Sequence, residues 1–433
     1  MQKLFTEFDS STAQQWKEQL VKDLKGIDFE ALVWKTNEGI KIQPFYTSEN
    51  SEQHVKPIFT HHDWAICEFI IVDDELQANK QALDALANGA SGLEFLISKK
   101  IDYTVLLKGI LLEHIYSLFH LPLDLLAEFK SALKAIPNGN DCFINTDVIA
   151  RLCERGNWHH TQNIDFDLVA TNTTIMVDAR MYQEAGANMI NELSFNLSHL
   201  NEYLHYYAEA NKLSQLKTIH ISVSVGGNFF MEIAKLRSLR KLIDFLMEQY
   251  QLSLAIHIHA QTTSMNKSQL DSYNNLLRST TEAMSASIGG SNSITVLPYD
   301  TSFNKPSNFS SRMARNQQLI LKEESYLNKV ADMAAGSYYI EHLTNQFCQQ
   351  AWEGFKIIEE KKGFIHLVME GEIQQIINHD AELLKEQFEK GSLVMVGVNK
   401  FRNEKETAPV EHSKGNKEAV KTKFEVITKL KLA

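Results

Sequence analysis

The chain has 433 residues, of which 44% are hydrophobic and 22% are charged, within the usual range of globular proteins. This composition excludes disorder for most of the chain, and it excludes a collagen-like or coiled-coil rod. The formal net charge of −11 argues against a protein that coats nucleic acid or anionic lipid, because such proteins need a cationic face.

The N-terminal residues and the cysteines both indicate an intracellular protein. Residues 1–9 include acidic side chains without the apolar core of a signal peptide, and no uncharged apolar run is long enough to span a bilayer. The four cysteines lie far apart with no C-x-x-C pair, which implies neither a zinc knuckle nor a disulfide framework. We therefore expect a soluble cytoplasmic protein with reduced thiols.

The first part of the chain is predicted to be an extension. Residues 1–30 show a helical pattern with Trp16, Leu20 and Leu24 on one face, and an irregular segment follows. We assign residues 1–85 to this N-terminal arm.

From residue 86 to residue 400, short β-rich runs alternate with helical patterns. The predicted strands are 92–98, 103–107, 142–146, 174–179, 218–224, 254–259, 293–297 and 329–332. Several are continuously apolar, as is typical of parallel strands buried on both faces. Eight strand–helix units predict an α/β fold, a (β/α)8 TIM barrel over residues 86–400, with a doubly wound open sheet as the alternative.

Helices and a polar tail complete the predicted elements. Helical spacing marks the segments 228–250, 269–288 and 309–322 in the barrel, and 336–364 and 372–388 after it. Residues 401–433 are predicted to be a polar linker and tail, in which 403–417 has the composition of a linker. Residues 421–432 are expected to dock back as one short strand or helix.

Candidate site residues follow from the barrel, whose reactive side chains project from the C-terminal ends of the strands. His257 and His259 share one face of a strand, and Asp300 follows the next strand. Three readings stay open: a metal pair, a hydrogen-bonding pair facing a polar cavity, or ordinary buried histidines. Arg312 and Arg315 share a helix face and could clamp a phosphate or a carboxylate, or pair structurally with Glu323 or Glu324.

Several blocks of the sequence, in order from about residue 174 to 400, resemble methylmalonyl-CoA mutase. They include YQEAGA at 182–187, GNFFMEIAKLR at 227–237, HAQT at 259–262, FSSRMARNQQLIL at 309–321 and GSYYIE at 336–341. The N-terminal segments 34–40 and 44–46 resemble the small subunit of this family in particular.

The resemblance implies a chemistry. The family interconverts methylmalonyl-CoA and succinyl-CoA, a step of propionate metabolism, by radical chemistry started from adenosylcobalamin. Catalytic members thread the pantetheine arm through the barrel and stack cobalamin on its C-terminal mouth. By position, Gln183 and His259 match residues that line the substrate cavity, with Asn228 and Gln261 as neighbours. In a live site His259 would hydrogen-bond the thioester carbonyl.

Departures from the family pattern predict a chain without catalytic activity. The arginine that grips the substrate carboxylate is replaced by His205, and the arginine before the cavity histidine is His257. The tyrosine-bearing stretch of catalytic members is missing from residues 44–70. The cobalt-binding pattern D-x-H-x-x-G does not occur, and the 33 residues after Lys400 are too few for a flavodoxin-like cobalamin domain of about a hundred residues.

The expectation is therefore a small, non-catalytic subunit of a heterodimeric methylmalonyl-CoA mutase. It carries no catalytic residue, cofactor or metal; adenosylcobalamin and acyl-CoA are handled by the larger catalytic partner, and neither nucleic acid nor membrane is bound. The vestigial cavity is expected to comprise Gln183, His205, Asn228, His257, His259 and Gln261. Two alternatives are an active barrel of a split mutase that takes cobalamin from a separate B12-binding chain, and a sensor of CoA thioesters.

Overall fold

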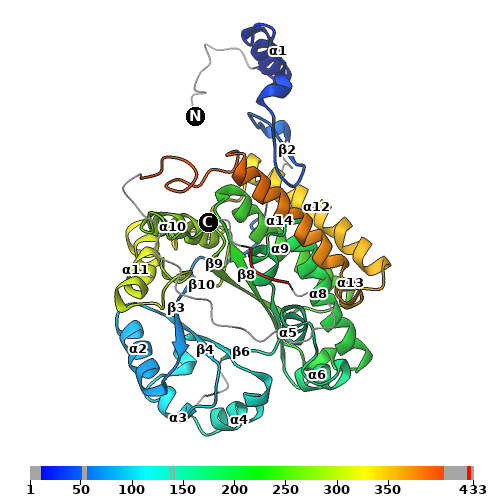
Figure 1. Ribbon diagram of the computed structural model, residues 1–433. Coiled ribbons are helices and arrows are strands. Elements are labelled where there is room, and N and C mark those ends of the chain that lie inside the picture. The colour runs from blue at the N-terminus through cyan, green and yellow to red at the C-terminus, as the bar shows by residue number, and fades with distance from the viewer. Residues whose placement is uncertain (1–10, 51–55, 137–138, 140–141, 404–426, 431–433) are drawn as a thin grey trace, which may run out of the picture.

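A sheet of eight parallel strands forms the centre of the molecule (Figure 1). The computed structural model describes residues 11–50, 56–136, 139, 142–403 and 427–430. The strands follow the spatial order β6-β5-β4-β3-β10-β9-β8-β7, and the sheet curls into a nearly closed barrel with helices around it. The predicted α/β barrel is confirmed.

The elements have the following bounds. The barrel strands are β3 (Ala65–Val72), β4 (Gly92–Ile97), β5 (Tyr116–His120), β6 (Phe143–Asn145), β7 (Thr174–Asp178), β8 (Thr218–Val225), β9 (Ala255–Thr262) and β10 (Ser293–Thr295). The helices up to the last strand are α1 (Ala13–Asp23), α2 (Glu75–Ala87), α3 (Tyr103–Leu106), α4 (Leu123–Lys134), α5 (Val148–Arg155), α6 (Gln162–Val169), α7 (Arg180–Glu184), α8 (Met189–Glu209), α9 (Phe229–Gln249) and α10 (Asn274–Ile288). After the last strand come α11 (Asn308–Leu319), α12 (Tyr338–Glu360), α13 (Phe364–Glu370) and α14 (Glu372–Glu389).

Alternation along each strand places polar side chains inside the barrel. On β9, Ile258 and Ala260 belong to the apolar core between the sheet and the helices. His257 and His259, one residue out of step with them, both hydrogen-bond to Ser293 on β10. Because successive side chains point to opposite faces of a strand, the polar set lines the barrel interior.

Side chains help to close the barrel between β6 and β7. Asn145 Nδ2 donates to Asp178 Oδ2 at 2.8 Å, and the backbone N–H of Asp178 donates to Asp147 Oδ2 at 2.6 Å. The other neighbouring strands are joined by parallel backbone ladders.

Two predicted strands are wrong. Residues 103–106 form helix α3, because Asp102 Oδ1 caps it by accepting hydrogen bonds from the backbone N–H groups of Thr104 and Val105. Residues 329–332 form turns, in which the Asp332 carboxylate pairs with Arg237 and accepts from the backbone N–H of Ile58.

Two strands of the barrel were not predicted. β5 is a five-residue strand inside a long apolar stretch, where no alternation marks its bounds. β3 pairs with β4 and β10 at the centre of the sheet order, although residues 65–72 fall in the segment expected as the N-terminal arm. The sheet thus begins before the predicted boundary at residue 86.

Helix α1, near the start of the N-terminal arm, extends away from the barrel in Figure 1. Helix α1 begins at a capping box formed by Thr12 and Gln15, and none of its residues is buried. Its Trp16 ring lies 5.0 Å from the ring of Phe45, and the antiparallel pair β1 (Trp34–Lys35) and β2 (Lys41–Ile42) follows. Helix α1 thus lies outside the core, whereas Ile40 and Ile42 further along the arm pack in the main apolar core, and the Tyr46 ring lies 5.7 Å from that of Tyr339 on α12.

The C-terminal elements lie along one side of the barrel. Helix α12 packs against α8 and α9, and the helices predicted at 336–364 and 372–388 are confirmed as α12 and α14. Most of the predicted linker 403–417 lies outside the described residues. Of the predicted docking segment 421–432, residues Ile427–Leu430 are described; they dock on the barrel without forming a helix or strand. No helix in the described part of the chain is long and apolar enough to cross a membrane.

Candidate functional site

The candidate site is a cavity of about 710 Å³ at the C-terminal ends of the barrel strands. Its walls include residues at or near the ends of β4, β5, β6, β7 and β9, together with helix α5 and the segment Ile427–Leu430. This is the face on which barrel enzymes carry their active sites, and the volume suits a small molecule.

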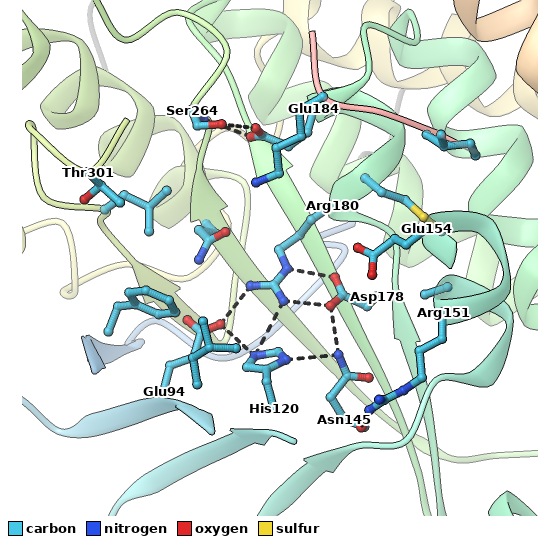
Figure 2. Close-up of a pocket in the computed structure, with 18 of the residues that line it drawn as sticks. Glu94, His120, Asn145, Arg151, Glu154, Asp178, Arg180, Glu184, Ser264 and Thr301 are labelled. Atoms are coloured by element: carbon cyan, nitrogen blue, oxygen red, sulfur yellow. Dashed lines mark hydrogen bonds and ion pairs between the residues drawn. The ribbon is translucent and has the colours of Figure 1, made fainter. Parts of the chain in front are cut away.

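An ionic network centred on Arg180 forms the floor of the cavity (Figure 2). Arg180 makes two hydrogen bonds of 2.7 Å to the carboxylate of Asp178 and one of 2.8 Å to Glu94. His120 lies 2.8 Å from the same oxygen of Glu94 and 3.0 Å from the amide of Asn145. Five side chains, from strands β4, β5, β6 and β7 and from the start of α7, are thus held in one network.

The charges of this network stabilise each other. Burial opposes ionisation of Glu94, but Arg180, His259 and His120 outweigh it and hold the pKa of this carboxyl well below its ordinary value. Burial likewise opposes ionisation of Asp178, and Arg180 nevertheless lowers its pKa to about 2. The pKa of Arg180 is raised by the two carboxylates despite its burial. Glu94, Asp178 and Arg180 are therefore charged and paired with one another at neutral pH.

Below this floor, aromatic and imidazole rings fill the barrel interior. The Tyr116 ring stacks on His257 with centroids 4.9 Å apart and hydrogen-bonds through its hydroxyl to His220 Nε2 at 2.9 Å. Phe143 lies 4.6 Å from His220 and 5.1 Å from His257. These rings come from β5, β6, β8 and β9, so they meet across the barrel axis.

The two histidines on β9 belong to this packed interior. Ser293 Oγ lies 2.9 Å from His257 Nε2 and 2.8 Å from His259 Nδ1. The other nitrogen of His259 lies 3.3 Å from Glu94 Oε2, and its side chain is 0% exposed. Burial, with a contribution from His259, lowers the pKa of His257 to about 3. Among the described residues, no group of three or more His, Cys, Asp or Glu side chains could hold a metal ion.

The other residues of the expected vestigial cavity are dispersed. Gln261 lines the cavity, whereas Gln183 is buried on α7 beside Gly226. Asn228 is exposed and contacts the sulfur of Met231. His205 lies on the solvent face of α8, paired with Glu209 at 3.3 Å and with its side chain 64% exposed, so the structure does not bring it to the cavity.

The two candidate arginines for CoA phosphate are not brought together either. Arg315 is buried, with Nη1 2.7 Å from Glu68 Oε2 on β3, and Arg312 is exposed. The pairing glutamate comes from a distant strand that was not predicted, and not from residues 323 and 324.

Sequence reasoning missed the residues that form the floor. Glu94 lies inside an otherwise apolar run, and Asp178 and Arg180 stand at the end of a predicted strand. A charged side chain in a strand buried on both faces needs a partner inside the barrel, and this signal could have pointed to the network.

The family model described as methylmalonyl-CoA mutase matches residues 161–432. The chain belongs to the methylmalonyl-CoA mutase family. It is 34% identical to the "Methylmalonyl-CoA mutase small subunit" of Porphyromonas gingivalis, over 94% of this chain and 72% of that relative.

Two further relatives are single proteins named for the whole enzyme. "Methylmalonyl-CoA mutase" of Rhizobium meliloti is 28% identical over 95% of this chain and 67% of its own length. The mitochondrial methylmalonyl-CoA mutase of Homo sapiens is 29% identical over 91% of this chain and 61% of its own length. The chain thus spans about two thirds of the length of these mutases.

Proposed function

We propose that this chain is a non-catalytic subunit of a heterodimeric, adenosylcobalamin-dependent methylmalonyl-CoA mutase. The observation that carries the proposal is the filled barrel interior. Two layers of side chains cross the axis, the Arg180 network above and the stacked rings of Tyr116, His220 and His257 below.

The filled interior matters because the resemblance requires an open one in catalytic members. A pantetheine arm that runs through the barrel would have to displace ion pairs and packed rings, both of which are costly to disrupt. The cavity above the Arg180 network is open to small molecules, but its floor is made of ionised side chains that are already paired. This arrangement also disfavours the alternative of an active barrel in a split mutase.

The state of His259 supports the same proposal. A catalytic histidine must point a free N–H at the carbonyl oxygen of the substrate. Here Nδ1 hydrogen-bonds to Ser293 Oγ, and Nε2 lies 3.3 Å from Glu94 Oε2 without the geometry of a hydrogen bond. The side chain is 0% exposed and does not line the cavity, so His259 is not placed to polarise a thioester bound there.

The residues at the mouth do not fit adenosylcobalamin. The segment Ile427–Leu430 lies at this mouth, with Ile427 and Leu430 each only 8% exposed, and the D-x-H-x-x-G pattern is missing from the sequence. In the proposal the cofactor and the acyl-CoA substrate belong to the larger catalytic chain.

The N-terminal arm offers a surface for that larger chain. Trp34, Phe45 and Ile27 are 50%, 53% and 59% exposed, on a segment whose helix α1 buries none of its residues. Large exposed apolar side chains on a projecting segment are typical of protein–protein interfaces, and obligate interfaces are the most apolar.

The proposal is tested by isolating the chain from its native cells under mild conditions and identifying its companions by mass spectrometry. We expect a 1:1 complex with a larger chain that carries D-x-H-x-x-G. We also expect succinyl-CoA to form from methylmalonyl-CoA and adenosylcobalamin only when that chain is present. Turnover by this chain with a separate cobalamin-binding protein, or its recovery as a homo-oligomer, would contradict the proposal.

A further inference from the structure

Three charged side chains are buried together between helices α8 and α9. Glu192 lies on α8, Glu232 and Lys235 lie one turn apart on α9, and each side chain is only 1% exposed. Lys235 Nζ lies 2.8 Å from Glu192 Oε2 and 2.8 Å from Glu232 Oε2, and it donates to the carbonyl of Ser224 at 2.9 Å. One ammonium group therefore serves two carboxyl groups.

One carboxyl oxygen of this cluster has no donor. Glu232 Oε1 accepts a hydrogen bond from the backbone N–H of Gly226 at 2.7 Å. Glu192 Oε1, in contrast, is buried without a hydrogen-bond partner in the described part of the chain. Burying an oxygen in this state is more costly for an ionised carboxylate than for a neutral carboxyl group. The site therefore favours a proton on Glu192.

The surroundings of Glu192 add negative charge. Besides Lys235 and Glu232 on α9, the charged group that faces Glu192 is Glu184 on α7. Glu184 accepts hydrogen bonds from hydroxyl groups on β8 and on the residues after β9. Burial, Glu232 and Glu184 together outweigh Lys235 and raise the pKa of Glu192 to about 7.

Other elements packed against α8 bring charged groups that have partners of their own. Helix α13 meets α8 through the ring of Phe364, which stacks on His199 of α8 with centroids 5.7 Å apart. The titratable groups and their partners are Asp178 of β7 with Arg180, Glu341 of α12 with Arg237, Glu359 of α12 with Asn201, Asp380 of α14 with Asn188 and Asn191, and His199 itself with Asp147. No cation in this set is free to neutralise Glu192.

The Arg180 network shows what Glu192 lacks. Arg180 also serves two carboxylates, but both oxygens of Glu94 have partners. Oε1 lies 2.8 Å from Arg180 and 2.8 Å from His120, and Oε2 accepts from Thr295 at 2.7 Å. Glu94 is therefore stable as a carboxylate inside the barrel, whereas Glu192 has one oxygen that only a proton can neutralise.

We propose that Glu192, Glu232 and Lys235 form a buried proton-binding site, which holds a proton on Glu192 near neutral pH and releases it as the pH rises. Release leaves an uncompensated carboxylate between α8 and α9 and weakens the packing of these helices. This inference concerns the chain by itself and does not depend on the proposed role as a mutase subunit.

The variant Glu192→Gln tests the proposal, because glutamine has nearly the shape of the protonated side chain and carries no charge. The folded parent keeps its proton up to about pH 7, whereas the unfolded chain loses it above the ordinary value of 4.5. Raising the pH through this window therefore destabilises the parent but not the variant. Urea denaturation between pH 5 and pH 8 measures both unfolding constants. We expect the ratio of parent to variant to rise at least about tenfold.

The matched control is Glu94→Gln, at another fully buried glutamate. Arg180 and its other partners hold the pKa of Glu94 well below its ordinary value, so Glu94 is charged throughout this range. The control is expected to be less stable than the parent by a factor that does not change between pH 5 and pH 8. The same constant loss of stability in Glu192→Gln would show that Glu192 is charged, and would overturn the proposal.

Infrared spectroscopy of the unaltered folded chain gives a second readout that needs no unfolding. A protonated carboxyl group has a C=O stretching band that a carboxylate lacks, and we expect this band to disappear between pH 6 and pH 8. Burial also raises the pKa of Glu359 to about 7, so the titration is repeated with Glu359→Gln. The band is expected to persist at pH 6 in this variant. Its absence there would assign the proton to Glu359 and contradict the proposal.

Discussion

The barrel interior buries charged side chains, whereas the N-terminal arm exposes large apolar ones. Inside the barrel, Glu94, Asp178 and Arg180 are buried charges, and each has partners from this same chain. On the arm, Trp34 and Phe45 are large apolar side chains that lie about half exposed. The barrel is complete without another molecule, whereas the arm leaves apolar surface for one.

This contrast indicates that the barrel interior determines the stability of the chain and that the arm serves its association with another chain. A sealed polar interior fixes the fold of the chain but leaves no route for a substrate through the barrel. The exposed apolar side chains of the arm do not fill the core, and such side chains on a projecting segment suit an interface. Changes in the interior are thus expected to alter folding, and changes in the arm are expected to alter assembly.

The largest effect is expected from Arg180→Met. The change leaves Glu94 and Asp178 in the interior without their cation, which costs about 3–5 kcal/mol of the free energy of unfolding. Urea denaturation followed by circular dichroism measures it. A loss below about 1 kcal/mol would show that the network does not hold the barrel together.

A smaller effect, on assembly alone, is expected from Trp34→Ala. If the arm binds the catalytic chain, an exposed tryptophan at its centre is a candidate hot spot worth about 2 kcal/mol, or roughly thirtyfold in Kd. Calorimetric titration of the two purified chains measures the affinity. The free energy of unfolding of this chain alone is expected to stay within about 0.5 kcal/mol; the reverse pattern would place Trp34 in the fold rather than in the interface.

The pH dependence of stability tests the packed rings. The folded pKa of His257 is about 3 and its ordinary value is 6.5, so between them the unfolded chain binds a proton that the folded chain does not. The free energy of unfolding therefore falls as the pH is lowered from 6.5 towards 3, by about 1.4 kcal/mol per pH unit for this one proton.

The variant His257→Asn cannot bind this proton, so its free energy of unfolding is expected to depend less steeply on pH. Denaturation at a series of pH values between 7 and 4.5 measures this dependence. His205→Gln, an exposed change on α8, is the matched control. Equal slopes for the parent and His257→Asn would mean that His257 is protonated in the folded chain.

The smallest effect is expected at a surface ion pair. Lys361 Nζ lies 2.7 Å from Glu372 Oε2, but both side chains are substantially exposed. Lys361→Met is expected to cost less than about 1 kcal/mol, because solvent and salt screen such pairs. Arg180→Met is measured in the same denaturation experiment. A larger loss of the free energy of unfolding for Arg180→Met than for Lys361→Met would show that burial, and not the distance between the charges, determines the cost of breaking an ion pair. Equal losses for the two variants would contradict this.

Much of the fold could be predicted because the buried strands are apolar runs separated by helical patterns. The failures have local causes. Residues 103–106 are rich in aromatic and branched side chains, yet a capping aspartate turns them into a short helix. β5 is short and lies within a long apolar stretch, so its bounds are set by pairing with β4 and β6, which the local sequence does not encode.

The site was harder to predict, because its residues meet only in the barrel. The shared face of His257 and His259 follows from strand geometry, and both do contact Ser293. The Arg180 network joins positions 94, 120, 145 and 178, which are far apart in the chain, and its register depends on strands that were missed. Alignment of His205 with a substrate-binding position gave no information on which face of α8 it occupies.

The most direct test of the account is mutase turnover by the assembled complex when this chain carries His259→Asn or Gln183→Ala. The sequence resemblance predicts that both positions correspond to residues that line the substrate cavity of catalytic members. If this barrel is structural, turnover per assembled complex stays within about twofold of the parent, since the chemistry occurs in the partner. A loss of about a hundredfold with assembly unchanged would place catalysis in this chain and contradict the account.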